Sequence, residues 1–226
     1  MFKLRNEFKR HIVKDLMPNT INLLFVLESP HTAEVTTGVP LAGSSGIIVT
    51  EVLKMALGFE DNSTPFGVLV RDNLQKLNIG IMNSSPIPLQ EGAYKEINPA
   101  SRKFIGILKT IRENSVPRTR NTKYGTAKEI NRVIDLIKSN LSRRINKAPI
   151  TANTIIILCG DFSKSMWPAC TDLKVKELHE LPHPSMGQWF DPKNISKILE
   201  LKRLARMVMT MTPEKAAIDT RQDITT

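Results

Sequence analysis

The sequence has few of the features that mark exported or membrane proteins. Its 226 residues include two cysteines, which are too few for a disulfide framework, so we expect both to be reduced thiols. No apolar run approaches the ~20 residues that a membrane helix needs, and the longest runs, Leu23–Leu27 and Ile155–Cys159, suit buried strands. Residues 1–10 are charged throughout and predict no signal peptide. We therefore expect a soluble, cytoplasmic protein that does not contact a membrane.

Signals for bound cofactors are also scarce. There is no glycine-rich loop of the G-x-x-x-x-G-K kind, so nothing supports an ATPase. The possible ligands of a zinc ion have irregular spacing; they are Cys159, Cys170, His179 and His183. We therefore expect neither a metal ion nor an organic cofactor.

Positive charge is concentrated in one segment. The net charge of the chain is +10, and residues 101–147 alone hold thirteen Lys or Arg and three acids, which also gives +10. Such a local excess favours a polyanionic partner, because Lys and Arg release condensed counterions from nucleic-acid phosphates. The alternative is a solvated helical face with spare lysines. A linker inside this segment carries Arg118, Arg120 and Lys123, which are candidate DNA-binding residues.

Apolar runs and helical patterns alternate along the chain and predict the class of fold. Strands are expected at residues 21–27, 78–83, 155–159 and 174–181, and helices at 2–16, 47–57, 66–76, 100–114, 127–142 and 194–209. This alternation predicts an α/β fold, a three-layer αβα sandwich with a mostly parallel four-stranded central sheet. We expect one domain over residues 1–210, with a basic helical insertion at about 101–147, and a disordered tail over residues 211–226.

Polar residues follow the expected strands. In open α/β sheets, ligands bind beyond the carboxyl ends of the strands. The first strand is followed by Glu28 and His31, the second ends at Asn83, and the fourth is followed by His183. We therefore expect the loops after the strands to line one site.

Taken in order, these segments resemble the active-site motifs of the uracil-DNA glycosylase superfamily over residues 21–185. Glu28-Ser29-Pro30 is similar to the first motif of the thermophile-type branch, in which Glu, a small residue and Pro follow the strand. The run G-x-P-L-x-G-x-x-G at residues 38–46 resembles the second segment of that branch, and residues 183–185 match the closing His-Pro-Ser motif. The resemblance implies a DNA glycosylase of base excision repair.

The chemistry of an N-glycosidic bond suggests roles for these residues. The bond breaks through an oxocarbenium-like sugar and an anionic base, so the Glu28 carboxylate would stabilise the cation or orient the water. His183 would donate to the oxygen of the departing base, and the Asn83 amide suits the edge of a flipped pyrimidine. The alternatives are structural: a solvated acid at a strand end, a histidine that bonds backbone, and an asparagine that caps its turn.

The resemblance also implies contacts with DNA. Ser44, Ser45 and Ser185 would offer donors to DNA phosphates, although ordinary helix capping also explains the serines. Met186 follows the His-Pro-Ser motif, where the family inserts a side chain into the vacated base stack.

Three features depart from the family pattern. Leu41 stands in place of an aromatic residue that stacks on the extruded base, a contact worth ~1–3 kcal/mol per base. His31 stands where the first motif more often has Gly or Tyr; it is a second acid–base group, a residue that narrows the pocket, or an exposed loop residue. Two cysteines cannot supply the four ligands of the iron–sulfur cluster of the thermophile-type branch.

These observations favour a monomeric DNA glycosylase that acts on uracil or another damaged or modified base, in single- or double-stranded DNA. One alternative is a nucleic-acid-binding protein of the same fold without catalytic activity, which Leu41 favours. Another is a nucleotide or nucleoside hydrolase on a similar sheet, which would gain little from the basic segment.

Overall fold

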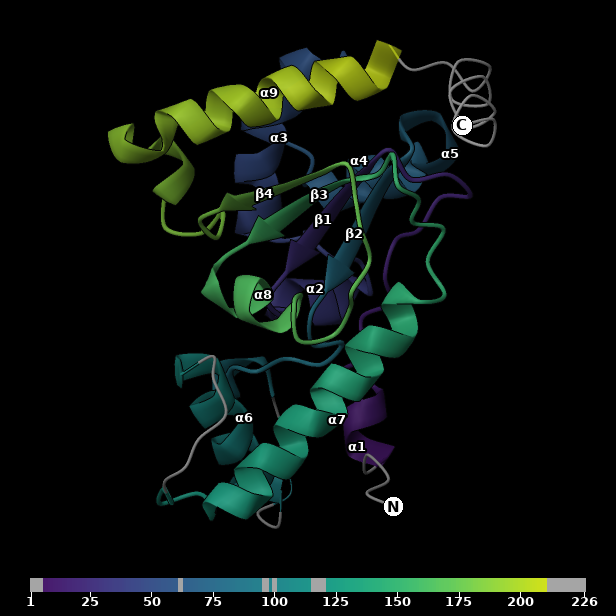
Figure 1. Ribbon diagram of the computed structural model, residues 1–226. Coiled ribbons are helices and arrows are strands. Elements are labelled where there is room, and N and C mark those ends of the chain that lie inside the picture. Colours follow the sequence, from purple (N-terminus) through teal and green to yellow (C-terminus); the bar gives the residue numbers. More distant parts are fainter. Residues whose placement is uncertain (1–5, 61–62, 95–97, 99–100, 115–120, 211–226) are drawn as a thin grey trace, which may run out of the picture.

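A parallel sheet of four strands forms the centre of the molecule (Figure 1). The computed structural model describes residues 6–60, 63–94, 98, 101–114 and 121–210. The strands are β1 (Leu23–Leu27), β2 (Ile79–Asn83), β3 (Ile155–Cys159) and β4 (Glu177–Leu181). They lie in the order β2-β1-β3-β4, and every neighbouring pair is parallel. All four carboxyl ends therefore meet at the same edge of the sheet.

The position of each strand in the sheet explains its composition. All residues of β1, β2 and β3 are buried, as expected for apolar strands that are covered on both faces. β4 lies at the edge, and only Leu181 of its five residues is buried. The polar residues Glu177 and His179 are accommodated there because an edge strand is open to solvent on one side.

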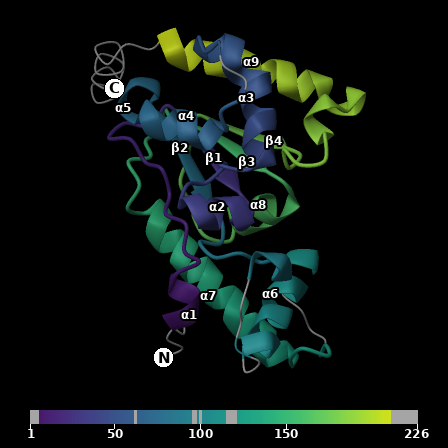
Figure 2. The same cartoon turned by 180° about the vertical axis from the view of Figure 1, so that it is seen from behind.

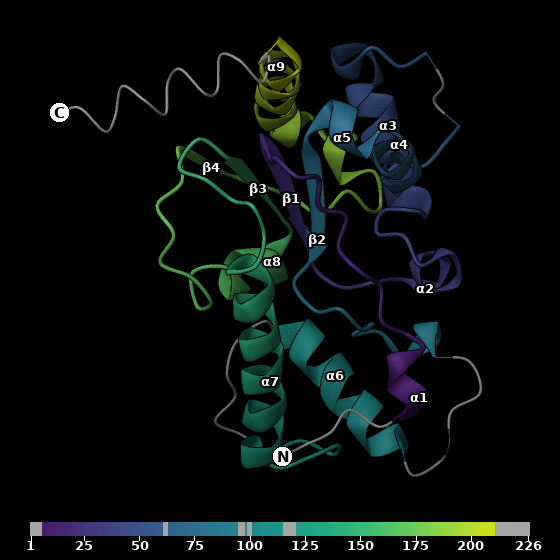
Figure 3. The same cartoon turned by 90° about the vertical axis from the view of Figure 1, so that its right-hand side faces the viewer.

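Helices cover both faces of the sheet (Figures 2 and 3). One face packs against α3 (Ser44–Leu57), α4 (Phe66–Asp72) and α9 (Ile195–Thr210) through an apolar cluster that includes Leu23 and Phe25. The other packs against α6 (Arg102–Asn114), α7 (Ala127–Ile145) and α8 (Asp161–Met166) through a cluster that includes Leu24 and Val26. Successive β1 side chains thus enter opposite cores, as the pleat requires. The expected three-layer αβα sandwich is confirmed.

The N-terminal segment differs from the helix expected at residues 2–16. The helix α1 (Asn6–Lys9) is short, and the chain beyond it is extended. Leu16 exchanges two backbone hydrogen bonds with Ile81 of β2, at 2.9 and 2.8 Å, and Val13 donates to the carbonyl of Pro86 at 3.0 Å. Backbone pairing with the outer edge of β2 outweighs the helical pattern here, because it satisfies groups that would otherwise lack partners.

Other differences concern short elements. The helix α2 (Thr32–Thr37) lies within a stretch expected to be a loop, and the helix expected at 66–76 is divided at Asn73 into α4 and α5 (Leu74–Leu77). The described 3₁₀ turns are η1 (Glu91–Ala93), η3 (Gln188–Phe190) and η4 (Pro192–Asn194). No helix in the described ranges is long and apolar enough to cross a membrane. The tail expected at 211–226 lies outside the described residues.

Candidate functional site

The loops after the strands surround a cavity of about 290 Å³ at the carboxyl edge of the sheet. The chain passes from β1 to β2 on one side and then returns to β3 on the other, and ligands of open α/β sheets bind at such a reversal of strand order. Nine residues singled out from the sequence line this cavity: Glu28, His31, Leu41, Ser44, Ser45, Asn83, His183, Ser185 and Met186. The fold therefore brings these nine candidate residues, which come from separate loops, to one cavity.

Glu28 follows β1 directly, and its carboxylate is paired with an arginine. Arg112, in the last turn of α6, donates from Nε to Oε1 of Glu28 at 2.6 Å. The side chain of Glu28 is 18% exposed and that of Arg112 is 44% exposed. A pair this open to water adds only about 0–1 kcal/mol to stability, so its main effect is to orient the carboxylate.

Asn83 ends β2 with its amide group buried in the wall of the cavity. The residue is 2% exposed, and among the described residues neither Oδ1 nor Nδ2 has a hydrogen-bond partner. Arg144 fixes the backbone here, because Nη2 donates to the carbonyls of Asn83 and Ser84 at 2.7 and 2.9 Å. The amide does not cap the following turn. Burial without a partner costs about 1–3 kcal/mol, and a ligand with both a donor and an acceptor would remove that cost.

His183 follows β4 and packs against the end of β3. Gly160 there has a φ of 87°, and a Cβ on it would lie 3.2 Å from Cβ of His183, so glycine permits the close approach. Nδ1 of His183 lies 2.9 Å from Oγ of Ser185. Burial lowers the pKa of His183 below its usual value of 6.5; the Glu28 carboxylate opposes this shift, and Arg112 reinforces it. His183 is therefore neutral at neutral pH.

A buried carboxyl group shapes the loop between α2 and α3. Glu34 accepts hydrogen bonds from the backbone N–H of His31, at 2.6 Å, and from that of Leu41. Leu41 has a φ of 54°, and a Cβ on Gly46 would lie 1.8 Å from its carbonyl oxygen. Burial raises the pKa of Glu34 from 4.5 to about 7. Glu34 thus joins the start of α2 to the turn that presents Leu41 to the cavity.

The candidate DNA contacts at the rim have two origins. Ser44 and Ser45 form the first turn of α3, where backbone N–H groups lack partners within the helix and attract anions. Met186 is 94% exposed and has a φ of 54°. Its loop is held from below, because the buried Trp189 donates from Nε1 to the carbonyl of Pro182 at 2.9 Å.

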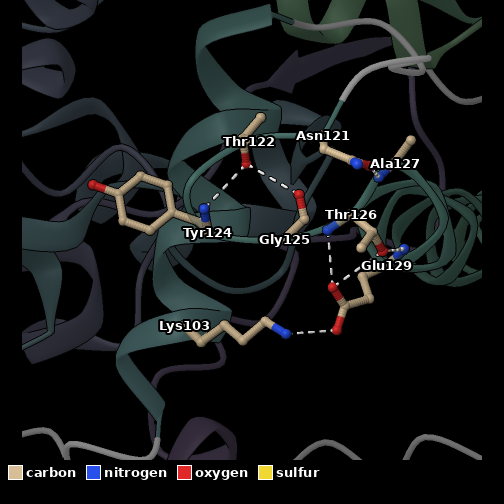
Figure 4. Close-up of polar contacts among 8 residues, drawn as sticks. All are labelled: Lys103, Asn121, Thr122, Tyr124, Gly125, Thr126, Ala127 and Glu129. Carbon is tan, nitrogen blue, oxygen red and sulfur yellow. Dashed lines mark hydrogen bonds and ion pairs between the residues drawn. The ribbon is translucent and has the colours of Figure 1, made fainter.

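Lys123 does not line the cavity; it belongs to a hairpin of the insertion, and Figure 4 shows its neighbours Thr122 and Tyr124. Thr122 and Gly125 exchange backbone hydrogen bonds at 2.8 and 3.3 Å. The ring of Tyr124 packs closely on α6, since a Cβ on Gly106 would lie 2.1 Å from it. Nζ of Lys123 lies 4.9 Å from the centre of the same ring. The hairpin therefore has a defined shape.

The start of α7 is closed by the chain itself. Thr126 and Glu129 form a capping box, Asn121 accepts from the backbone of Ala127 at 2.9 Å, and Lys103 pairs with Glu129 at 2.7 Å (Figure 4). These contacts use the donors that would otherwise bind an anion. The other two candidates in this segment, Arg118 and Arg120, lie outside the described residues.

The described ranges contain one group of possible metal ligands with atoms within 4.8 Å of one another, and it does not line the cavity. Its members are Glu177, His179 and Glu200. Both oxygens of Glu200 are bound by Arg203, at 2.7 and 2.8 Å, and His179 is paired with Glu177 at 3.0 Å. These side chains therefore contact one another or Arg203, and neither cysteine belongs to the group.

Two charged residues of the cavity, Glu34 and Arg112, were not predicted as site residues from the sequence. Glu34 lies in a stretch expected to be a loop, where its spacing from His31 gives only a weak signal of a helix start. Arg112 was counted in the basic segment without a role of its own, since its contact with Glu28 joins residues 84 positions apart. The helix expected at residues 100–114 includes Arg112, but the sequence does not show which end of that helix lies beside the strand ends.

Comparison with known proteins adds little to this description. No protein-family model matches the chain, and no curated protein matches it. Among solved structures, a similar chain is a provisionally assigned uracil DNA glycosylase from Methanosarcina acetivorans, determined in solution by NMR. The identity is 14%, the match covers 88% of this chain and 98% of that chain, and the TM-score is 0.47. At this level the likeness carries no conclusion about the chemistry of the present chain.

Proposed function

We propose that the protein is a DNA glycosylase that cleaves the N-glycosidic bond of uracil or of another damaged or modified base. The observation that carries this proposal is the Asn83 amide, which is buried in the cavity wall and has no partner among the residues that the structure describes. We further propose that residues 1–210 act as one domain.

The Asn83 amide suits the edge of a nucleobase. A carboxamide offers a donor and an acceptor side by side, and a pyrimidine edge carries the complementary pair. Enzymes that act on a base in DNA extrude it into a pocket and bind its edge in this way. The base would replace the partners that Asn83 lacks, so binding would be selective for its hydrogen-bonding pattern.

Glu28 would act on the sugar. Oε1 is taken by Arg112, and Oε2 has no partner among the described residues. A carboxylate held in this way stabilises an oxocarbenium-like sugar or orients the attacking water.

His183 would stabilise the leaving base. When the Ser185 hydroxyl donates to Nδ1, the proton of the neutral imidazole is on Nε2, which then donates to the oxygen of the departing anion. The lowered pKa of His183 favours the neutral imidazole, which donates a hydrogen bond to the base without placing a positive charge beside the cationic sugar.

The proposal is tested by strand cleavage after alkali on labelled single- and double-stranded oligonucleotides that carry uracil, hypoxanthine, xanthine or thymine mismatches. Glu28→Ala and His183→Ala should each lower the rate of abasic-site formation by about 10²–10³-fold. Glu60→Ala and His179→Ala remove the same groups outside the cavity and should retain the rate. Wild-type protein that binds DNA but forms no abasic product from any substrate would refute excision of these bases.

A second candidate is a DNA-binding protein of this fold that does not excise bases. Leu41 favours it, because an aliphatic side chain cannot stack on an extruded base as an aromatic ring does. The same assay separates the two functions, since a binder retains salt-dependent affinity without a product.

A further inference from the structure

Arg112 lies where the basic insertion meets the cavity. Among the described residues of α6, it alone lines the cavity. Its contact with Glu28 joins the insertion to the loop after β1. The residue therefore belongs both to the basic segment and to the proposed catalytic site.

The ion pair leaves hydrogen-bonding groups available on Arg112. Nε is bound to Glu28, and in the part of the chain that the structure describes, the two terminal amino groups have no partner. The guanidinium donors are fixed in one plane and point in different directions, so one arginine can hold two anions at the same time. Because Arg112 is exposed, a second anion can reach it without displacing Glu28.

We propose that Arg112 bridges Glu28 and a backbone phosphate of the bound DNA strand. Its Nε holds the carboxylate, and its terminal amino groups bind the phosphate. This inference rests on the proposed function, because it assigns Arg112 as a positioning residue that acts through Glu28. The bridge would fix the carboxylate relative to the DNA backbone, so the site would favour a polynucleotide over a free nucleoside.

The charges around the pair favour a bridge over an exchange of partners. If a phosphate drew Arg112 away, Glu28 would lose its cation at the moment when its orientation matters. His183 would also lose a positive charge that acts together with burial to keep it neutral. A bridge retains both effects and adds the phosphate contact.

The test combines changes in the protein with changes in the DNA. Oligonucleotides carry 2′-fluoro-2′-deoxyuridine, whose glycosidic bond is stable, and one uncharged methylphosphonate linkage at each position in turn around that nucleotide. Their affinities are measured for the wild type, Arg112→Ala, Arg112→Lys and Glu28→Ala. Arg102→Ala, which removes an exposed charge from the opposite end of α6, is the matched control.

At one linkage, we expect neutralisation to weaken wild-type binding by about tenfold and to leave Arg112→Ala unaffected. Arg102→Ala should respond like the wild type. Glu28→Ala should weaken the coupling, because the arginine loses its anchor. In single turnover on the cleavable substrate at saturating protein, Arg112→Ala should slow excision at least tenfold. Arg112→Lys should recover affinity but not this rate, since an ammonium group lacks the planar fork.

Equal effects of every linkage in wild type and Arg112→Ala would overturn the bridge, as would an unchanged single-turnover rate in Arg112→Ala. A wild-type protein without excision activity refutes the proposed function alone. The affinities on the uncleavable strand still decide the bridge in that case, through the coupling between Arg112, Glu28 and the phosphate.

Discussion

The cavity and the basic insertion use polar residues in opposite ways. In the cavity, the side-chain amide of Asn83 is buried without a partner among the described residues, and Glu34 is buried with two backbone donors. In the insertion, the ion pair of Lys103 and Glu129 is exposed, and Lys123 lies over the face of a tyrosine at the surface. The first arrangement places polar groups where water is scarce, and the second leaves them in water.

This difference separates two kinds of function. A buried polar group costs free energy and interacts strongly with a matching ligand, because the surrounding dielectric is low. Exposed charges interact weakly one by one, and their effect on a polyanion grows with their number and falls with salt. We therefore expect changes in the cavity to alter the rate of reaction, and changes in the insertion to alter affinity.

The largest expected effect comes from Asn83→Leu. Leucine has a similar size and needs no hydrogen-bond partner, so the free energy of unfolding should stay the same or rise by about 1 kcal/mol. The rate of base excision should fall by about 10²–10³-fold, because the base edge loses its donor and acceptor. Urea denaturation and single-turnover kinetics measure the two quantities on the same preparation.

Asn121→Leu is the matched change in the insertion. Asn121 accepts a hydrogen bond from the first turn of α7, so its loss should destabilise the protein by about 1 kcal/mol without slowing excision at saturating protein. If Asn83→Leu were instead the more destabilising of the two changes, the amide would have a structural role. A retained rate of excision in Asn83→Leu would contradict the role of the amide in binding the base.

The same contrast explains what the sequence could predict. The order of strands and helices follows from apolar runs, since burial on both faces leaves continuous hydrophobic segments. The cavity residues after β1, β2 and β4 were found because a parallel sheet places the carboxyl ends of its strands together. Local pattern and topology together were sufficient for these features.

Contacts between distant segments were not predictable in this way. Leu16 continues a helical pattern but pairs with β2, because the backbone of an edge strand needs partners whatever its side chains are. Arg112 reaches Glu28 only because α6 ends beside the cavity. Glu34 is buried because α2 turns it inward. In each case the position of the residue in the tertiary structure decides its role, and the local sequence pattern alone does not predict that role.

A smaller effect is expected from the titration of Glu34. A carboxyl whose pKa is raised in the folded state favours folding while it is protonated, and this contribution is lost as pH rises from 4.5 to about 7. The rise corresponds to about 3 kcal/mol, since one pKa unit is worth about 1.4 kcal/mol. The stability of the wild type relative to Glu34→Gln should therefore fall by up to this amount between pH 4.5 and pH 8, as measured by urea denaturation.

Glu60→Gln, a change at an exposed carboxyl outside the cavity, supplies the baseline for this comparison. The difference in unfolding free energy between Glu60→Gln and the wild type should vary little over the same pH range. If the difference in unfolding free energy between the wild type and Glu34→Gln were constant with pH, the two backbone donors would stabilise the ionised carboxylate enough to offset its burial.

The smallest effect is expected from neutralising Arg118, Arg120 and Lys123 together. The plot of log affinity against log salt has a negative slope, and each phosphate contact that is lost should make this slope shallower by about 0.9. Binding at low salt should weaken by about tenfold or less. Removal of three cations from α9, at Lys197, Lys202 and Arg206, is the charge-matched control, because α9 packs on the face of the sheet opposite the insertion. Excision at saturating protein should be unchanged in both variants, since the three cations of the first variant are proposed to bind the DNA backbone and those of α9 do not line the cavity. Equal losses of affinity in the two variants would mean that net charge alone attracts DNA, whereas a loss confined to the first variant would identify the insertion as the surface that holds it.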